Sequence, residues 1–459
     1  MTAAAQRKTT AVPPTISAAL ALLCTAWCAP ACAAGAVIVE GPALFGVPVD
    51  FILFGATLLG VALFHHHTLR VALIGLATIL AYKFLIVGFK FGPGFDGFVV
   101  HLRHEWVILT NLFMLLMGFA LLSRHFEKSR VPAELPRILP HDWKGAFWLL
   151  VIVFVLSSFL DNIAAAMIGG AMAHTLFRAK VHIGYLAAIV AASNAGGSGS
   201  VVGDTTTTMM WIAGVSPIEV LHAYVAAFAA MVIFGIPAAI QQQRYSPILK
   251  HEHHYIQIDW PRLGIVACIL VAAIVANVIV NVEYPELSDK FPFIGAAVWG
   301  AILLSAPVRR ADWEVMPETF KGSVFLLSLV LSATLMPVEK LPDASWHVAM
   351  GLGFVSAVFD NIPLTALALK QGGYDWGFLA YAVGFGGSMI WFGSSAGVAL
   401  SNMYPEAKNA GRWLFHGWHV TLAYVIGFAA LLFTLGWQPH PPHKSTPDTP
   451  VATVPTPVR

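Results

Sequence analysis

The sequence predicts an all-α polytopic membrane protein, built as two inverted repeats with re-entrant helical hairpins and broken transmembrane helices. Hydrophobic residues make up 58% of the 459 residues and charged residues only 11%. The mean hydropathy is +0.73, which is more apolar surface than a soluble chain can bury. An Asp-Asn pair followed by a glycine-rich segment occurs in each half of the chain, inside apolar sequence. A net charge of +2 gives no basis for nucleic-acid binding, so the expected partner is the lipid bilayer.

The N-terminal segment has the layout of a secretory signal peptide over residues 1–34. Basic Arg7 and Lys8 precede an apolar stretch at 16–27, and small residues follow. An uncleaved first helix is the alternative. The rest of the chain divides into a first repeat with an extra N-terminal helix (35–245), a linker helix region (246–290), a second, inverted repeat (291–437) and a disordered tail rich in Pro and Thr (438–459).

Apolar runs long enough to cross a bilayer predict the spanning helices. In chain order these runs are 49–64, 69–89, 105–123, 183–215, 219–241, 262–281, 292–308, 321–337, 376–404 and 412–437. Two further apolar segments, 144–177 and 346–370, hold the Asp-Asn pairs near their middles. Each is too long for one straight helix and too short for two crossings, so each is expected to enter the membrane and return to the same side. Lys83, near a span end, is expected to extend to the membrane surface.

Charge in the loops sets the orientation. Basic residues cluster between 124 and 144 and again at Arg178 and Lys180, on both sides of the first Asp-Asn segment. Positively charged loops face the cytoplasm. The second segment is flanked by mixed charges at 339–343 and 370–375, which suits the outside. The first hairpin therefore enters from the cytoplasm and the second from outside, which is the topology of inverted repeats. We expect a multi-pass protein of the bacterial inner membrane whose mature termini are periplasmic.

Two spans contain glycine- and serine-rich stretches near their middles, at 193–200 and at 384–397. Because Gly and Ser disfavour helix interiors, each span is expected to break into two half-helices. Close helix packing is the alternative role for these glycines. A broken helix exposes carbonyl groups and amide donors, and hard oxygen ligands suit a small cation.

Three carboxylates, Asp161, Asp204 and Asp360, fall within these elements, and no Lys or Arg accompanies them. A buried carboxylate must be neutralised by a proton or by a cation. Both species then compete for one site, which gives antiport when the site alternates between the two sides. Asp204 has a second interpretation, as the cap of a half-helix. Asp161 and Asp360 are expected to carry the exchangeable charge and to bind Na⁺, oriented by Asn162 and Asn361.

The full set of candidate residues for ion and proton binding is Asp161, Asn162, Asn194, Ser198, Asp204, Thr205, Asp360, Asn361, Ser388, Ser394 and Ser395.

The motifs resemble those of the NhaD-type sodium/proton antiporters. These belong to the ion transporter superfamily, with the arsenite permeases and the sodium-coupled citrate and dicarboxylate carriers. The similarity is concentrated at 193–211, at Asp161-Asn162, at 360–364 and at 386–399. It implies two inverted five-element repeats, hairpin tips that meet broken helices at the midplane, an elevator-like or rocking movement and often a homodimer.

Departures from the family pattern are Ser193 and Gly199, where the family usually has Ala and a bulky aromatic residue, and a shorter connection between Asn361 and Gly386. The carboxylate carriers tend to have Ser-Asn-Thr at the hairpin tips, so the Asp-Asn pairs favour the antiporter branch.

We therefore expect a secondary transporter, not an enzyme, that exchanges Na⁺ or Li⁺ for H⁺ and needs no cofactor beyond the transported ions. The alternatives are a sodium-coupled citrate or dicarboxylate symporter and an arsenite-type anion permease. An intramembrane aspartyl protease also needs two membrane aspartates, but its Tyr-Asp and Gly-x-Gly-Asp elements are replaced here by Leu160-Asp161 and Val202-Gly203-Asp204. A channel is a further alternative, although titratable acids at the midplane suit coupled transport better.

Overall fold

The computed structural model describes residues 41–64, 67–135, 139–200, 202–248, 257–284 and 287–440. The predicted signal peptide lies outside these residues, as does the predicted tail beyond residue 440. Helices dominate this part of the chain, and its one sheet pairs the two-residue strands β1 (Ala43–Leu44) and β2 (Val47–Pro48). Six helices of the described ranges are long and apolar enough to cross a membrane. The all-α polytopic membrane class is confirmed.

The N-terminal helices are α2 (Val49–Leu63), α3 (Thr68–Tyr82), which continues as a π-helical turn to Val87, and α4 (Gly94–Lys128). Helix α4 has 35 residues and begins well before the span predicted at 105–123. Its first turns are polar, and hydropathy detects only the apolar part of a helix. At 1.5 Å per residue α4 is about 52 Å long, well over the roughly 30 Å of hydrocarbon in a bilayer.

Lys83 does not extend to the membrane surface as expected. It is buried at the end of α3, and its Nζ lies 2.6 Å from Asp50 Oδ1 at the start of α2. The expectation was wrong because a carboxylate 33 positions earlier along the chain supplies a counter-charge, and an ion pair makes a buried ammonium tolerable.

Each Asp-Asn pair joins two short helices, as the hairpin prediction requires. The first pair of helices is α6 (Trp143–Ser157) and α7 (Asn162–Leu176), and the second is α15 (Trp346–Ser356) and α16 (Asn361–Gln371). At 15 residues, α6 and α7 are each about 22 Å long, too short to cross the bilayer singly. Re-entry from one side of the membrane remains a prediction.

Both predicted helix breaks are present. Helix α8 (Ile183–Ser198) is followed by α9 (Thr205–Ile212), and α17 (Trp376–Gly386) by α18 (Ser395–Met403). The first break lies later than predicted, because the helix continues through Ser198. Gly196 stays helical, and a Cβ there would lie 2.0 Å from the Phe154 carbonyl oxygen of α6. This glycine therefore serves close packing.

The two halves use the same glycine contacts. Gly203, in the first break, abuts the Ser157 carbonyl, where a Cβ would lie 2.0 Å from the oxygen. In the second break, Gly393 abuts the carbonyl of Ala357, at the end of α15, in the same way, at 2.5 Å. Each broken helix thus packs on the backbone of the first helix of its hairpin. The inverted orientation of the halves and the domain bounds remain predictions.

The other α-helices are α5 (Val131–Glu134), α10 (Pro217–Leu221), α11 (Ala223–Tyr245), α12 (Trp260–Val278), α13 (Phe293–Ser305), α14 (Met316–Thr334), α19 (Ala410–His416) and α20 (Trp418–Leu435). The span predicted at 412–437 is interrupted at Gly417. A Cβ at Gly417 would lie 2.7 Å from the Trp413 carbonyl oxygen and 2.9 Å from Ala187 Cβ, so close packing against α8 accompanies the bend.

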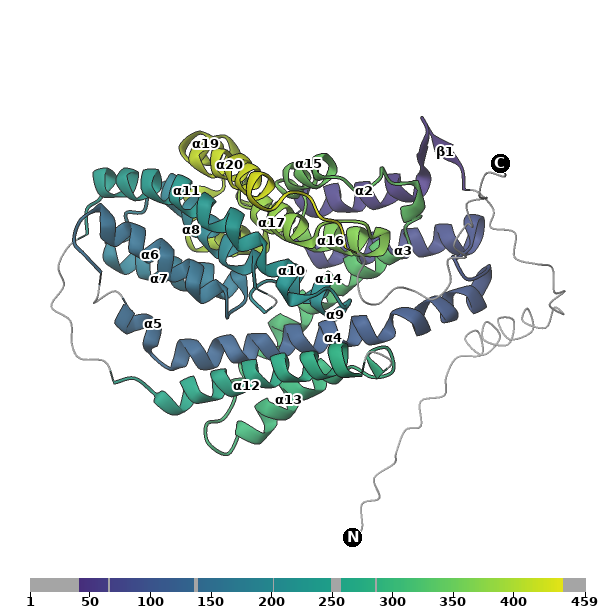
Figure 1. Ribbon diagram of the computed structural model, residues 1–459, viewed down its shortest axis with the longest axis horizontal. Helices are drawn as coiled ribbons and strands as arrows, with labels where there is room; N and C mark the ends of the chain where they lie inside the picture. The colour runs from purple at the N-terminus through teal and green to yellow at the C-terminus, as the bar shows by residue number, and fades with distance from the viewer. Residues whose placement is uncertain are drawn as a thin grey trace, which may run out of the picture. The chain divides into compact units, whose positions relative to one another are not determined.

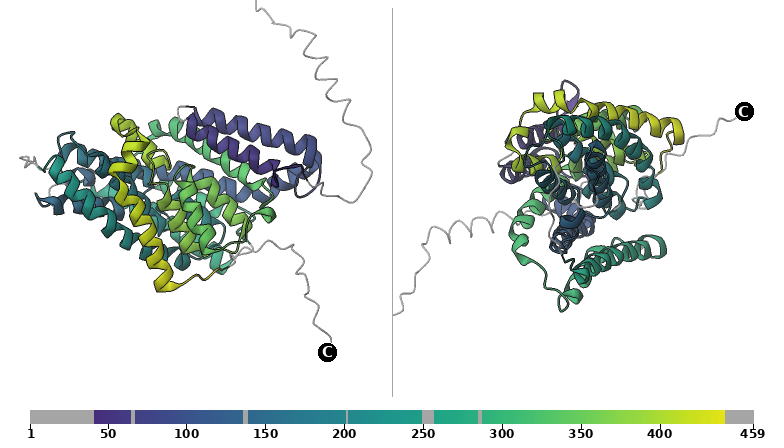
Figure 2. Two further views of the ribbon diagram at one scale, coloured as in Figure 1. Left: turned by 90° about the horizontal axis from the view of Figure 1, so that it is seen from above. Right: turned by 90° about the vertical axis from the view of Figure 1, so that its left-hand side faces the viewer.

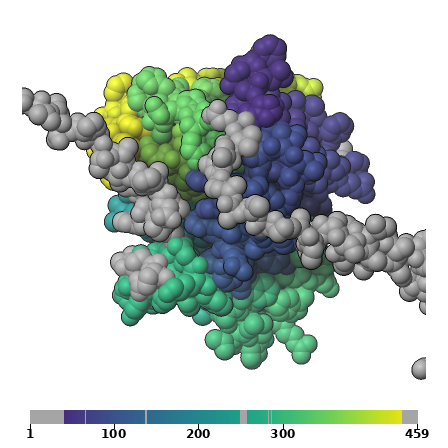
Figure 3. Space-filling model, turned by 90° about the vertical axis from the view of Figure 1, so that its right-hand side faces the viewer, coloured from purple at the N-terminus to yellow at the C-terminus, as the bar shows by residue number. Residues whose placement is uncertain are grey.

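The helices form two groups. Helix α4 packs against α12, α13 and α14, and α14 also packs against α3 (Figure 1). In the second group α11 packs against α6, α8 and α20 (Figure 2). Figure 3 shows α2, α3 and α4, purple to blue, along one face. The groups meet where α9 contacts α4 and α16 contacts α14, next to the Asp-Asn pairs.

Candidate functional site

Asp161 and Asp360 are the N-caps of the second hairpin helices, α7 and α16. Asp161 Oδ2 accepts a hydrogen bond from the Ile163 amide at 3.2 Å, and Asp360 Oδ1 accepts one from the Ile362 amide at 3.1 Å. Their backbones have nearly identical angles, with φ of −52° and −53° and ψ of 140°. A capping role was considered in the sequence only for Asp204, whereas these two aspartates each satisfy an amide at a helix start.

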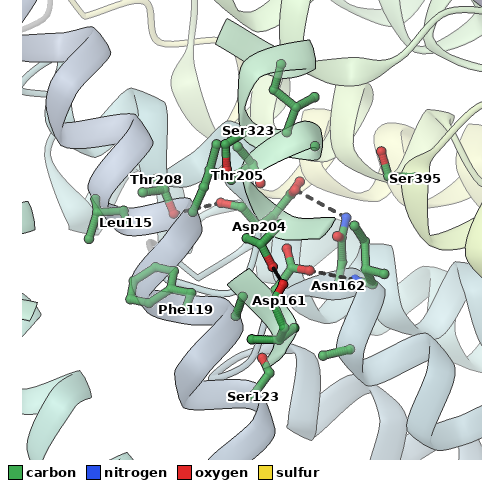
Figure 4. Close-up of a pocket in the computed structure, with 18 of the residues that line it drawn as sticks. Leu115, Phe119, Ser123, Asp161, Asn162, Asp204, Thr205, Thr208, Ser323 and Ser395 are labelled. Carbon is green, nitrogen blue, oxygen red and sulfur yellow. Dashed lines mark hydrogen bonds between the residues drawn. The ribbon is translucent and has the colours of Figure 1, made fainter. Parts of the chain in front are cut away.

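Asp204 is the meeting point of the two halves. It lies at the N-cap position of α9 but makes no side-chain capping bond. Its Oδ1 accepts from Asn162 Nδ2 at 3.2 Å, and its Oδ2 accepts from Asn361 Nδ2 at 3.4 Å and from Thr206 Oγ1 at 2.5 Å. The hairpin asparagines therefore orient Asp204, not the aspartates beside them in sequence as predicted. Figure 4 shows Asn162 bonded to Asp204, with Asp161 beside them.

Asn194 extends this network to the second helix break. Its Oδ1 accepts from Asn162 Nδ2 at 3.1 Å, and its Nδ2 donates to Ser388 Oγ at 2.9 Å and to Ser394 Oγ at 3.2 Å. Ser395 donates separately to Asp360 Oδ2 at 3.1 Å. The network thus joins both hairpin tips to both breaks, although these segments are far apart in the sequence.

Ser198 is the least suitable of the candidate ligands in the structure. Its hydroxyl donates to the Ala195 carbonyl of its own helix at 2.9 Å. Two contributors were missed. Thr206 holds Asp204, and the Ser193 hydroxyl donates to the Asn162 carbonyl at 2.6 Å. An Asp followed two residues later by Thr is a local signal that identifies Thr206, whereas nothing in the sequence links Ser193 to Asn162.

A cavity of about 520 Å³ opens onto this network. The candidates that line it are Asp161, Asn162, Asp204, Thr205, Asn361 and Ser395. Helices α4 and α14 form the opposite wall, from Leu112 to Glu127 and from Glu318 to Leu326, together with Val315 just before α14. Asp360, Asn194, Ser388 and Ser394 are not among the lining residues. The structure therefore separates a cavity-facing part of the candidate set from a supporting part.

The electrostatics of the cavity are negative. None of the ion pairs within the described ranges involves Asp161, Asp204 or Asp360. Arg124 also lines the cavity, but it lies 2.6 Å from Glu127 and 3.6 Å from Asp312. A buried carboxylate without a fixed counter-charge is costly. A proton or a small cation coordinated by carboxylate, amide and hydroxyl oxygens would remove that cost.

The chain has recognisable relatives, although no family model matches it. Sodium/proton antiporter 1 of Arabidopsis thaliana is 24% identical over 375 residues, which are 72% of this chain and 63% of that protein. Sodium/proton antiporter 2 of the same plant is 27% identical over 340 residues, 64% of this chain and 75% of that protein. The Na⁺/H⁺ antiporter NhaD of Vibrio parahaemolyticus is 24% identical over 340 residues, 63% of this chain and 80% of that protein.

The alignment thus spans less than two thirds of the length of the first of these relatives. All three are named as transporters rather than enzymes, and their names match the resemblance carried by the Asp-Asn and glycine-rich motifs. The chain is a multi-pass membrane protein related to the NhaD-type sodium/proton antiporters.

Proposed function

We propose that the chain is a secondary transporter that exchanges Na⁺ or Li⁺ for H⁺ across the bacterial inner membrane. The observation that carries the proposal is the convergence of both halves on Asp204. This buried carboxylate accepts from Asn162, Asn361 and Thr206, and no ion pair within the described ranges involves it. The names of the relatives support the same activity. Periplasmic termini and a homodimer are parts of the proposal that rest on loop charge and on the family resemblance.

In this mechanism Asp161 and Asp204 share the exchangeable charge, because both line the cavity. A proton neutralises the pair in one state and the cation in the other. Asn162 and Asn361 donate through Nδ2, which leaves their amide oxygens as further ligands for a hard cation. Asp360 keeps a supporting role, because it caps α16 and holds Ser395. The ligand set thus differs from the predicted one by placing Asp204 at the centre.

Exchange between the two sides needs the site to open alternately. The cavity lies where the group containing α4 and α14 meets the hairpins and α9. Movement of one group against the other would close this cavity and open a path on the far side. A carboxylate symporter is less well supported, because its anionic substrate would bind beside Asp161 and Asp204, and among the described lining residues the one basic side chain, Arg124, is already paired with Glu127 and Asp312.

The test is proton flux in proteoliposomes that contain a pH-sensitive dye. Wild type should move protons when Na⁺ or Li⁺ is added, and Asp161→Asn and Asp204→Asn should lose this response while still folding. Asp375→Asn is the matched control, since Asp375 also caps a helix, accepting from the Gly377 amide at 3.1 Å, but lies outside the network. Uptake of labelled citrate without proton movement by the wild type would refute antiport.

A further inference from the structure

The wall of the cavity that faces the carboxylates is largely apolar. It includes Leu112, Leu115, Leu116 and Phe119 on α4 and Leu326 on α14. Figure 4 shows Leu115 and the Phe119 ring on the α4 side of the cavity, across from the carboxylates. A small cation is bound through hard oxygen ligands, and none of these five side chains has an oxygen. The wall therefore suits a ligand that has an apolar part of its own.

The size of the cavity and the placement of its polar groups fit such a ligand. Its volume of about 520 Å³ lies within the roughly 300–1,000 Å³ of pockets that bind organic molecules, in which a few polar groups orient the ligand against apolar walls. Here Asp161, Asn162 and Asp204 lie together on one side. The hydroxyls of Ser123 and Ser323 are buried without a partner among the described residues and lie on opposite sides of the carboxylates, so they leave the apolar wall between them continuous.

The charge of the ligand follows from the carboxylates. Asp161 and Asp204 line the cavity, and no ion pair within the described ranges involves either of them. Arg124, the one basic side chain among the described lining residues, is paired with Glu127 and Asp312. A primary ammonium group has three donors and no acceptor, which matches a site of carboxylate oxygens. An organic anion would be repelled by the same site.

We propose that the cavity also binds a monovalent organic ammonium ion with an aromatic or branched aliphatic body, in place of Na⁺. The ammonium group occupies the cation position at Asp161 and Asp204, and the body lies against Leu115 and Phe119. This inference rests on the proposed function for the cation position, and it adds a second class of ligand. Removing the apolar body and the apolar wall from water supplies affinity that a bare ammonium group lacks.

The experiment compares benzylammonium with methylammonium, which has the same charged group without the ring. Binding to the purified wild-type protein is measured by calorimetry near neutral pH. Benzylammonium should bind at least about tenfold more tightly, because burial of the ring adds to the affinity. Added Na⁺ should raise the apparent dissociation constant of benzylammonium in proportion to its concentration. Equal affinities for the two amines, or benzylammonium binding that is independent of Na⁺, would overturn the proposal.

Phe119→Leu tests whether the ring lies where the structure places it. Leucine keeps the wall apolar but removes the aromatic face, so benzylammonium should bind about three- to tenfold more weakly. Methylammonium and Na⁺ should stay within about twofold of wild type. Phe113→Leu is the matched control on the same helix, since Phe113 packs against Phe320 and is not among the residues that line the cavity. Equal effects of the two variants on benzylammonium would place the ligand elsewhere and contradict the proposal.

Asp204→Asn tests the charged end, and a thermal unfolding midpoint near that of wild type shows that the variant is folded. It should lose benzylammonium and Na⁺ together, and retained benzylammonium binding would refute the shared position. Sodium-driven proton flux in proteoliposomes without amine keeps this inference distinct from antiport. A wild type that shows flux but binds the two amines equally retains antiport and loses the organic-cation site. A wild type without flux that binds benzylammonium in competition with Na⁺ loses antiport and retains the organic-cation site.

Discussion

The sharpest prediction concerns Asp204→Asn. The substitution keeps the shape of the side chain and removes the charge on which Asn162 and Asn361 converge. A unit charge about 4 Å from a bound cation contributes about 4 kcal/mol at the effective dielectric of proteins. Its loss should therefore weaken Na⁺ binding about a thousandfold, and exchange should fall below detection at Na⁺ concentrations that saturate the wild type.

The effect of Asp204→Asn on folding is smaller, because two terms oppose one another. In the asparagine, an NH₂ group replaces one carboxylate oxygen, so two donors face each other. The facing donor is the side-chain amide of Asn162 or Asn361, or the Thr206 hydroxyl, and a donor left without an acceptor costs about 1–3 kcal/mol. The same change removes a buried charge that is in no ion pair with another described residue, which is stabilising. We expect a thermal unfolding midpoint close to that of the wild type.

The assay combines sodium-driven proton flux, calorimetric Na⁺ binding and thermal unfolding of the purified protein. Thr206→Val is the matched control, because it removes one hydrogen bond to Asp204 and keeps the charge. A charge-assisted hydrogen bond contributes about 1.5–3 kcal/mol, so this variant should lose affinity by roughly 10- to 150-fold and keep its maximal flux. Exchange by folded Asp204→Asn at more than a tenth of the wild-type rate would refute Asp204 as the charge carrier.

Three further predictions test coupling, stability and packing. Because proton and cation compete for the same carboxylates, lowering the pH by one unit should raise the half-saturating Na⁺ concentration up to about tenfold, and a value independent of pH would contradict the shared site. Lys370→Met leaves the buried Glu105, 3.5 Å away, without this ion-pair partner, and should lower the free energy of unfolding in denaturant by about 3–5 kcal/mol. Lys90→Met, at an exposed ion pair, should lower it by only about 0–1 kcal/mol. Equal losses for the two variants would contradict a stabilising role of the buried pair. Gly203→Ala places a Cβ 2.0 Å from a carbonyl oxygen of α6 and should abolish the monodisperse peak in size-exclusion chromatography. Gly264→Ala, whose Cβ would have nothing within 4 Å, should leave the peak intact. A normal peak for both variants would show that folding does not need the close contact of Gly203 with α6.

Much of the helical framework could be predicted because apolar length has a direct physical meaning in a bilayer. The short helices around both Asp-Asn pairs and the two helix breaks are found close to where composition indicates them. Hydropathy gave the wrong helix bounds where a segment is polar but helical, or apolar but interrupted. The polar turns at the start of α4 are helical, and Gly417 divides α19 from α20 inside a continuous apolar run. A scale that measures transfer into lipid does not measure either effect.

The contacts within the candidate site were harder to predict than the presence of polar residues in apolar sequence. Intramembrane polarity indicated residues that the structure joins in one hydrogen-bond network, because a carboxylate in apolar sequence is expensive wherever it points. Sequence adjacency then suggested that each asparagine orients its neighbouring aspartate. In the folded chain Asp161 and Asp360 cap helices, and Asn162 and Asn361 reach across to Asp204. Side chains on adjacent residues of a helix start point in different directions, so adjacency was a poor guide.

The sequence by itself determined that this is a membrane protein, that its two halves carry matching Asp-Asn and glycine-rich segments, and that acidic residues lie within these segments. These properties follow from composition and periodicity, which are local. Tertiary structure alone decided which carboxylate becomes the centre of the hydrogen-bond network, which described serine hydroxyls are buried without a hydrogen-bond partner, and which glycines allow close helix packing instead of breaking a helix. Those outcomes depend on contacts between segments up to about two hundred residues apart, and the free energy of such a contact depends on the position of both partners in space, which no local pattern contains.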